Sequence, residues 1–446
     1  MEPEHTAART RRMAGAGATA SGDWHAGTVL DPRRGPSVRE MLWLERYADV
    51  QAAFRSRDFE QGGGGRRDSA PIVGDSLLSL SGDPHFARRR LESVLFRRSE
   101  LVHYQRDVLL PSLQRTLDAC RTTQRGPDGI VRTDLTALLR WTLLRLSARL
   151  AGLDGVDEDP ERLAAFRACT DRLAEGVNAE WMNTDHAEVI RGALEAKEHF
   201  TREFFVPAWR RREVLASAHA AGRVASDELP RDLMMLLVRE RDAFAGWDPD
   251  VLVREAILFS GATTGTIATT LPHIVVELSA WLGDHPEDRQ HLLDSEFLRR
   301  AASESLRLHP PAPYLIRRAI RDTVLPSGAS VGASQYVVLD LIRANRDPAA
   351  MGAEPDRFDL HRQVADQARP YGLSFGDGPH TCIGRGLAIG EVSGGSSDVD
   401  APGLIVTILR ELYRAGMELD PDDPPRWSDQ SVRNDHAAVP VRLVNP

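Results

Sequence analysis

The helical spacing of apolar residues from Asp83 to about Gly283 is the feature that most restricts the fold. Leucines at three- and four-residue intervals between Leu135 and Leu150 describe an amphipathic helix with one buried face. Residues 250–283 form the longest helical candidate in the chain. Between residues 312 and 345, alternation with Gly and Pro predicts short strands and turns. The sequence therefore predicts a mainly α fold with a small β part (α+β).

One large domain accounts for most of the chain. With 446 residues, 42% of them hydrophobic, the chain can bury a sizeable core. Residues 1–25 are low in complexity and are predicted to be a disordered tail, which leaves residues 26–446 as the domain. No apolar run approaches the ~18 residues that span a membrane, and the N-terminus lacks the apolar region of a signal peptide.

Charge and cysteine content narrow the class of protein. The formal net charge of -9 argues against wholesale nucleic-acid binding. The three cysteines, Cys120, Cys169 and Cys382, are too sparse for a disulfide framework and suit a reducing compartment. A soluble, cytoplasmic protein with no nucleic-acid or membrane partner is expected.

The segment FGDGPHTCIG, residues 375–384, is the most informative motif. Gly376 and Gly378 permit a tight turn, and a helix start follows Cys382. A sulfur at a helix N-terminus meets unpaired N–H groups and the positive end of the dipole, which favour thiolate over thiol. A thiolate is an axial ligand of haem iron in O–O cleavage chemistry. A buried free cysteine in a glycine-rich turn, or a zinc site with His380, would also use these residues, although a second ligand pair for zinc is lacking.

This segment resembles the haem-binding loop of the cytochrome P450 superfamily, and the resemblance spans about residues 40–440. It implies a single large helical domain with short β-sheets that binds haem b (iron protoporphyrin IX). Cys382 would be the iron ligand, and Phe375, Gly376, His380 and Gly384 would line the cofactor site.

Two further sets of residues match landmarks of that family. Glu304 and Arg307 form an E-x-x-R pair on one helix face, and the resemblance implies that Arg357 joins them in a structural triad. The two haem propionates need cations or donors. The resemblance implies that four basic residues contact the propionates: His85, Arg89, Arg317 and His380. Arg318, next to Arg317, could take the place of Arg317.

The helix over 250–283 resembles the family's oxygen-binding helix, whose motif fits this sequence in two registers. SGATT places the oxygen-binding threonine at Thr264, and GTIATT places it at Thr269. The 35 residues from Thr269 to Glu304, and a helix kink expected where Pro272 frees the Ala268 carbonyl, favour Thr269.

In both registers the acid of the family motif is absent. Ala268 or Thr263 stands in its place, so the usual general-acid route for protons is in doubt. Water, the substrate or His273, one turn beyond Thr269, could supply protons instead. A packed or solvated residue is the simpler interpretation of His273.

The resemblance implies a monooxygenase that activates O2 to oxidise a small organic substrate, plausibly in secondary metabolism. Ferredoxin and ferredoxin reductase would donate electrons, because no flavin or nicotinamide fingerprint is present. Oxidative coupling, desaturation, peroxide use and a non-catalytic haem sensor stay open as alternatives. Residues 393–403, rich in Gly, interrupt the helix after the cysteine, and this insertion is expected to alter the choice of redox partner.

Overall fold

The computed structural model describes residues 38–63, 65–66, 68–181, 185–241, 248–390, 401–428 and 435–444. The predicted tail, residues 1–25, lies outside the described residues. So does the insertion at 393–403, except for its last residues, 401–403.

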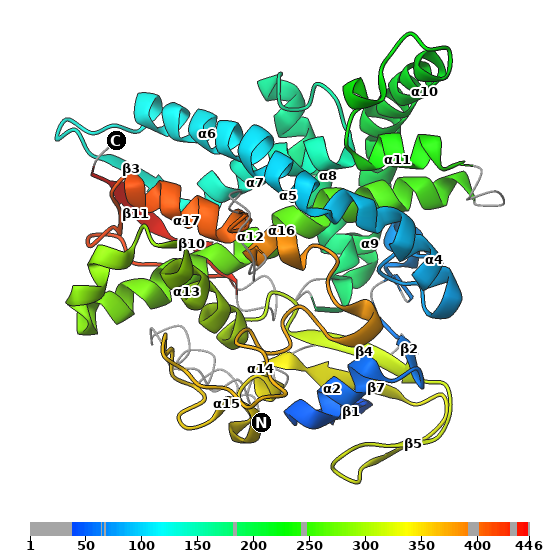
Figure 1. Cartoon of the computed structure of the whole chain (residues 1–446), viewed down its shortest axis with the longest axis vertical. Helices are drawn as coiled ribbons and strands as arrows, with labels where there is room; N and C mark the ends of the chain where they lie inside the picture. Colours follow the sequence, from blue (N-terminus) through cyan, green and yellow to red (C-terminus); the bar gives the residue numbers. More distant parts are fainter. Residues whose placement is uncertain are drawn as a thin grey trace.

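Helices make up most of the described chain (Figure 1), as the apolar spacing predicts. The first half contains α2 (Tyr47–Arg55), α3 (Ala70–Val73), α4 (Gly82–Glu92), α5 (Arg98–His103), α6 (Leu110–Thr123), α7 (Leu135–Ala151), α8 (Pro160–Val177), α9 (His186–Phe200) and α10 (Val206–Ala220). The second half contains α11 (Leu233–Arg239), α12 (Pro249–Asp284), α13 (Ser295–Leu308), α14 (Leu341–Ala344), α15 (Pro348–Met351), α16 (Arg385–Ile389) and α17 (Leu404–Arg414). The expected mainly α class is confirmed.

The β part consists of short strands in small sheets. The largest sheet has the order β1 (Leu42–Leu44), β7 (Tyr336–Asp340), β4 (Tyr314–Ala319) and β2 (Phe59–Gln61), with only β1 and β7 parallel. A second sheet joins β3 (Val131–Asp134), β11 (Pro440–Leu443) and β8 (Met417–Leu419). Two strand pairs complete the β part: β5 (Thr323–Val324) with β6 (Ser330–Val331), and β9 (Arg426–Trp427) with β10 (His436–Ala438). The largest sheet lies with α2, α14 and α15 at one end of the molecule, away from the main group of helices (Figure 1).

The long helix α12 forms the centre of the core, where it packs against α7 and α13. The side chain of Asp248 caps its first turn by accepting a hydrogen bond from the Asp250 N–H, and Pro249 occupies the first helical position. Pro272 lies inside α12, which continues unbroken to Asp284. The leucines of α7 between Leu135 and Leu150 are buried, so the predicted apolar face of that helix packs in the core.

The helix after the cysteine is divided, as its glycines predict. α16 ends at Ile389 and α17 begins at Leu404. Gly390 and Gly403 both have positive φ, and a Cβ on Gly403 would lie 2.3 Å from the Gly390 nitrogen. These two glycines therefore allow the ends of α16 and α17 to approach closely. Among the described helices, none has both the length and the apolar composition that crossing a membrane requires.

Candidate functional site

Cys382 lies in a tight loop immediately before α16. Its N–H donates to the Phe375 carbonyl at 2.8 Å, and Gly376 and Gly378 adopt φ near +66° and +65°. A Cβ on Gly378 would approach the Phe54 carbonyl oxygen of α2 to 2.8 Å, so a larger residue there would displace the loop. The glycines thus hold the cysteine loop against α2.

The Cys382 thiol lines a cavity of about 350 Å³, into which the residue is exposed. Burial is the largest effect on this thiol and raises its pKa, whereas the N–H groups of Gly384 and Arg385 and the positive charge of Arg89 act to lower it. The predicted N–H donors are present, but burial outweighs them. A thiolate at this depth therefore needs a bound cation for its full stabilisation, as an axial ligand of iron would have.

Four basic side chains line the same cavity, brought together from separate segments: His85, Arg89, Arg317 and His380. The rings of His85 and His380 lie 4.0 Å apart, and His380 Nδ1 is 3.0 Å from Gln61 Nε2. Arg89 Nη2 donates to the Thr381 carbonyl at 2.6 Å. The structure thus gathers the basic residues that the sequence nominated for one anionic group.

Among the described residues, an acid acts on only one of these four groups: burial lowers the pKa of Arg89, and Cys382 and Glu92 act against this larger effect. Burial alone lowers the pKa of Arg317 to about 10. Burial, and then Arg89, lowers the pKa of His85 to about 4, and within the described chain His85 Nδ1 is a buried ring nitrogen without a hydrogen-bond partner. Burial and the neighbouring cations lower the pKa of His380 to about 3. A group carrying carboxylates would pair with the two arginines and accept hydrogen bonds from the imidazoles, which fits the two propionates of haem.

The neighbouring Arg318 does not take the place of Arg317. Its guanidinium points to the other side of β4, where Nη1 pairs with Glu60 Oε1 at 2.8 Å. Arg317 is buried over the Phe54 ring and lines the cavity. Alternation along the strand decides between the two arginines.

The E-x-x-R pair forms a buried network, but its third member differs from the prediction. Arg307 donates to both oxygens of Glu304 at 2.8 Å. Arg362, not Arg357, completes the triad, because Arg362 Nε lies 2.8 Å from Glu304 Oε1 and its side chain is only 6% exposed. The Arg357 side chain is 59% exposed and 3.7 Å from Glu354, so its assignment to the triad is wrong. Both arginines lie in an irregular loop that follows α15 and has no periodic pattern, so the sequence alone could not separate them.

The residues of α12 that line the cavity differ from the predicted oxygen-binding threonines. The cavity is lined by Ala262, Thr263, Thr266, Ile267 and Thr270. Neither nominated threonine, Thr264 or Thr269, lines it, and neither does Ala268.

Thr264 instead lies on the side of α12 that faces α7. Its hydroxyl is 3.4 Å from the Leu143 carbonyl. The missed residues Thr266 and Thr270 lie one turn apart on the cavity face, and their hydroxyls donate to the carbonyls of Ala262 and Thr266 at 2.7 and 2.8 Å. Helical periodicity gives the spacing of such a face, but only packing fixes which face meets the cavity.

The sequence suggested His273 as an alternative proton donor, and the structure places it elsewhere. Its ring stacks on His309 with centroids 4.2 Å apart and lies 4.7 Å from the His436 ring. His273 is buried and is not among the described residues that line the Cys382 cavity. Core packing is therefore its role, in agreement with the simpler interpretation of the sequence.

The cluster around His273 makes stability depend on pH. Burial lowers the pKa of His436 to about 4, below the value of about 6.5 in an unfolded chain. The unfolded state therefore binds more protons between these values, and folding stability falls as pH falls through this range. Between pH 7 and pH 5 the free energy of unfolding of the native protein should fall by about 2 kcal/mol more than that of the His436→Phe variant. Urea unfolding at the two pH values measures both decreases. Equal losses in the native protein and the variant would contradict this prediction.

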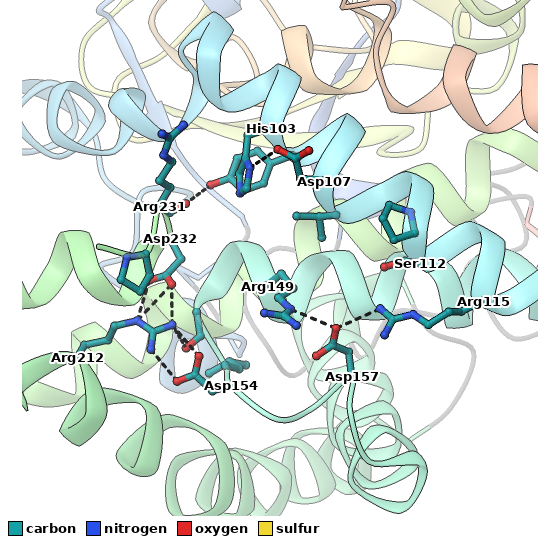
Figure 2. A pocket seen from close by; sticks show the side chains of 16 residues that line it. His103, Asp107, Ser112, Arg115, Arg149, Asp154, Asp157, Arg212, Arg231 and Asp232 are labelled. Atoms are coloured by element: carbon teal, nitrogen blue, oxygen red, sulfur yellow. Dashed lines mark hydrogen bonds and ion pairs between the residues drawn. The ribbon is translucent and has the colours of Figure 1, made fainter. Parts of the chain in front are cut away.

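A separate charged cleft of about 330 Å³ lies among α5, α6, α7 and the start of α11 (Figure 2). Arg115 and Arg149 approach Asp157 from two sides, at 3.3 and 3.1 Å. Arg212 binds Asp154 and Asp232. Because these groups satisfy one another, the cleft holds helices and loops together, and it shares no described lining residue with the Cys382 cavity.

Comparison with known proteins agrees with this geometry. The family model described as "Cytochrome P450" matches residues 178–394. A cyclooctat-9-en-7-ol 5-monooxygenase from Streptomyces melanosporofaciens is 26% identical over 401 residues, which cover 82% of this chain and 80% of the relative. Pulcherriminic acid synthase from Bacillus subtilis is 29% identical over 381 residues, covering 81% and 82%. The solved structure of CalO2 superposes with a TM-score of 0.66 at 21% identity, covering 95% of this chain and 96% of the other.

Proposed function

Because this chain belongs to the cytochrome P450 superfamily, we propose that Cys382 is the axial thiolate ligand of a b-type haem in a monooxygenase that oxidises a small organic molecule. The observation that supports this proposal most directly is that the Cys382 thiol lines one cavity together with His85, Arg89, Arg317 and His380. The haem-thiolate group, when bound, supplies the activation of O2.

Different residues of the chain would contact different parts of the haem. Arg317 would neutralise a propionate, and the neighbouring histidines His85 and His380 would donate hydrogen bonds to the propionates. The N–H groups of Gly384 and Arg385 would hold negative charge on the sulfur. The apolar residues that make up most of the cavity lining exclude water. This arrangement binds and orients a cofactor between the cysteine loop and α12.

The relatives support a place in secondary metabolism, since the names of two of them denote enzymes that make or tailor specialised small molecules. Electrons come from redox partners, for which we propose a ferredoxin and its reductase, and we propose the cytoplasm as the location. The test is a spectrum of the reduced protein with CO, followed by turnover under ¹⁸O2 with a ferredoxin system. A Soret band without the red shift of thiolate ligation, or products free of ¹⁸O, would overturn the proposal.

The composition of the cavity favours one second candidate, peroxide-driven or other atypical chemistry. The described residues that line the Cys382 cavity include no Asp or Glu, in agreement with the missing motif acid. Proton delivery therefore lacks a carboxylic acid at the usual place. Turnover with hydrogen peroxide that exceeds turnover with O2 and a reductant would favour this candidate.

We propose that the Thr270 hydroxyl would hold a proton at the side of α12 that lines the cofactor cavity. Its hydroxyl is on the cavity face of α12. We expect Thr270→Val to lower product formed per electron consumed at least about tenfold, because positioned proton donors contribute on the order of 10²–10⁴ in rate. Thr269→Val is the matched control and should leave this ratio unchanged. A larger effect of the Thr269 variant would restore the register that the sequence favoured.

A further inference from the structure

A second cavity, of about 280 Å³, continues from the Cys382 cavity along α12. The two share a boundary of mostly apolar residues: Leu78, Leu258, Ala262, Thr266, Ala312 and Leu315. Because the cofactor would occupy the space next to Cys382, the second cavity is the place left for a substrate beside it. Its volume is near the lower end of the range for small-molecule pockets, about 300–1,000 Å³.

Two glycines, Gly261 and Gly265, form one wall of this second cavity. Both lie inside α12, where each glycine costs about 1 kcal/mol relative to alanine. Neither has a positive φ, and a Cβ at either position would meet no described protein atom within 4 Å. Packing within the protein therefore gives no reason for glycine there, whereas a ligand lying against the backbone of α12 does.

Aromatic rings line the cavity together with the glycines. Trp181, at the end of the short helix Ala179–Trp181, and Tyr314, at the start of β4, both line it, with ring centroids 5.4 Å apart. Trp43 packs edge-on behind Tyr314 at 5.3 Å and supports that ring. Rigid aromatic faces and a smooth glycine surface favour a flat, ring-containing molecule.

The cavity also selects against charge. The described residues that line it include no Asp, Glu, Lys, Arg or His. Its polar side-chain groups come from five described residues: Thr170, Asn178, Trp181, Thr266 and Tyr314. Burying a carboxylate or ammonium there would lack a compensating partner and would be costly. A neutral molecule with one or two hydrogen-bonding groups suits this lining.

We infer that the substrate is a compact, neutral molecule with a flat ring system, bound along α12 against Gly261 and Gly265 with Trp181 as an aromatic contact. Gly261, Gly265 and Trp181 are then the residues that determine its size and shape. This inference rests on the proposed function, because the second cavity serves as a substrate site only if the first holds the haem.

The test compares three probes of similar carbon count against the haem-loaded protein. They are 2-methoxynaphthalene (flat and neutral), 2-naphthoate (flat and anionic) and 1-undecanol (flexible and neutral). Dissociation constants come from calorimetry and from the spin-state shift of the Soret band. We expect 2-methoxynaphthalene to bind at least tenfold more tightly than either of the others. Equal or weaker binding of 2-methoxynaphthalene would overturn the inference.

Matched variants locate the site. We expect Gly265→Val to weaken the binding of 2-methoxynaphthalene at least tenfold, because the side chain fills the space against α12. Gly283→Val is the control, since Gly283 is an exposed glycine of the same helix with no described atom near its Cβ position. It should change binding less than twofold. Unaltered binding by the Gly265 variant would overturn the assignment.

A second pair of variants tests the aromatic contact. Trp181→Ala should weaken binding of 2-methoxynaphthalene about tenfold, and Trp181→Phe should restore it to within threefold of the native protein. A reduced-CO spectrum of each variant separates the two hypotheses. If a variant keeps the red-shifted CO spectrum and binds the probe as the native protein does, only the substrate inference is overturned. If the native protein itself lacks the spectrum of thiolate ligation, the proposed function is overturned.

Discussion

Replacing Cys382 with serine is expected to abolish both the red-shifted Soret band of the reduced CO complex and all oxygenation of substrate. Serine keeps the shape of the loop, in which the residue 382 N–H donates to the Phe375 carbonyl. Its hydroxyl stays protonated at neutral pH and so cannot supply the anionic sulfur that favours O–O cleavage. The measurements are the CO spectrum and product formation with a ferredoxin system.

Cys120 provides the matched control for that substitution. It is a buried free thiol between α6 and β3, 3.8 Å from the Thr133 hydroxyl, and it does not line the Cys382 cavity. Cys120→Ser should keep the red-shifted band and the activity. The axial assignment would fail if the Cys382 variant kept that band.

Replacing Arg362 with alanine is expected to lower the free energy of unfolding by about 3–5 kcal/mol, because it removes one partner from a buried ionic network. Arg362 neutralises Glu304 together with Arg307, and it also donates to the carbonyls of Met351 and Arg357. Its loss leaves the buried Glu304 carboxylate with one cation fewer. Urea unfolding of the haem-loaded protein measures the effect, and haem retention should fall with it.

Arg357→Ala separates this prediction from a general effect of removing an arginine. The Arg357 side chain is 59% exposed and pairs with the exposed Glu354 at 3.7 Å, so its loss should change stability by no more than about 0.5 kcal/mol. If the Arg357 variant were the less stable of the two, the triad inferred from the sequence would be right and the one seen in the structure wrong.

Much of the site could be predicted from the sequence, because it depends on local motifs. The glycine spacing before Cys382 dictates a turn that only glycines adopt easily, and the turn places the sulfur before a helix. Glu304 and Arg307 are three residues apart on a helix, so local geometry suffices to pair them. His85 and Arg89 are one turn apart on α4, so helical spacing places them on one face, and that face lines the Cys382 cavity.

Other parts depend on contacts between distant segments. Whether Arg357 or Arg362 reaches Glu304 depends on the path of an irregular loop, which no periodicity encodes. The rotation of α12 about its own axis decides that Thr266 and Thr270, rather than Thr269, meet the cavity. That rotation is set by packing against α7 and α13, whose positions in the fold the α12 sequence does not contain.

The sequence by itself determined the helical class through the spacing of its apolar residues, and its resemblance to the family nominated Cys382 as the proposed iron ligand together with basic residues that line the same cavity. Only the tertiary structure decided the third arginine of the triad, the threonines that face the cavity and the glycine-lined space beside them. The physical reason is that these features arise where segments far apart in sequence pack together, and burial of their combined apolar surface selects the arrangement.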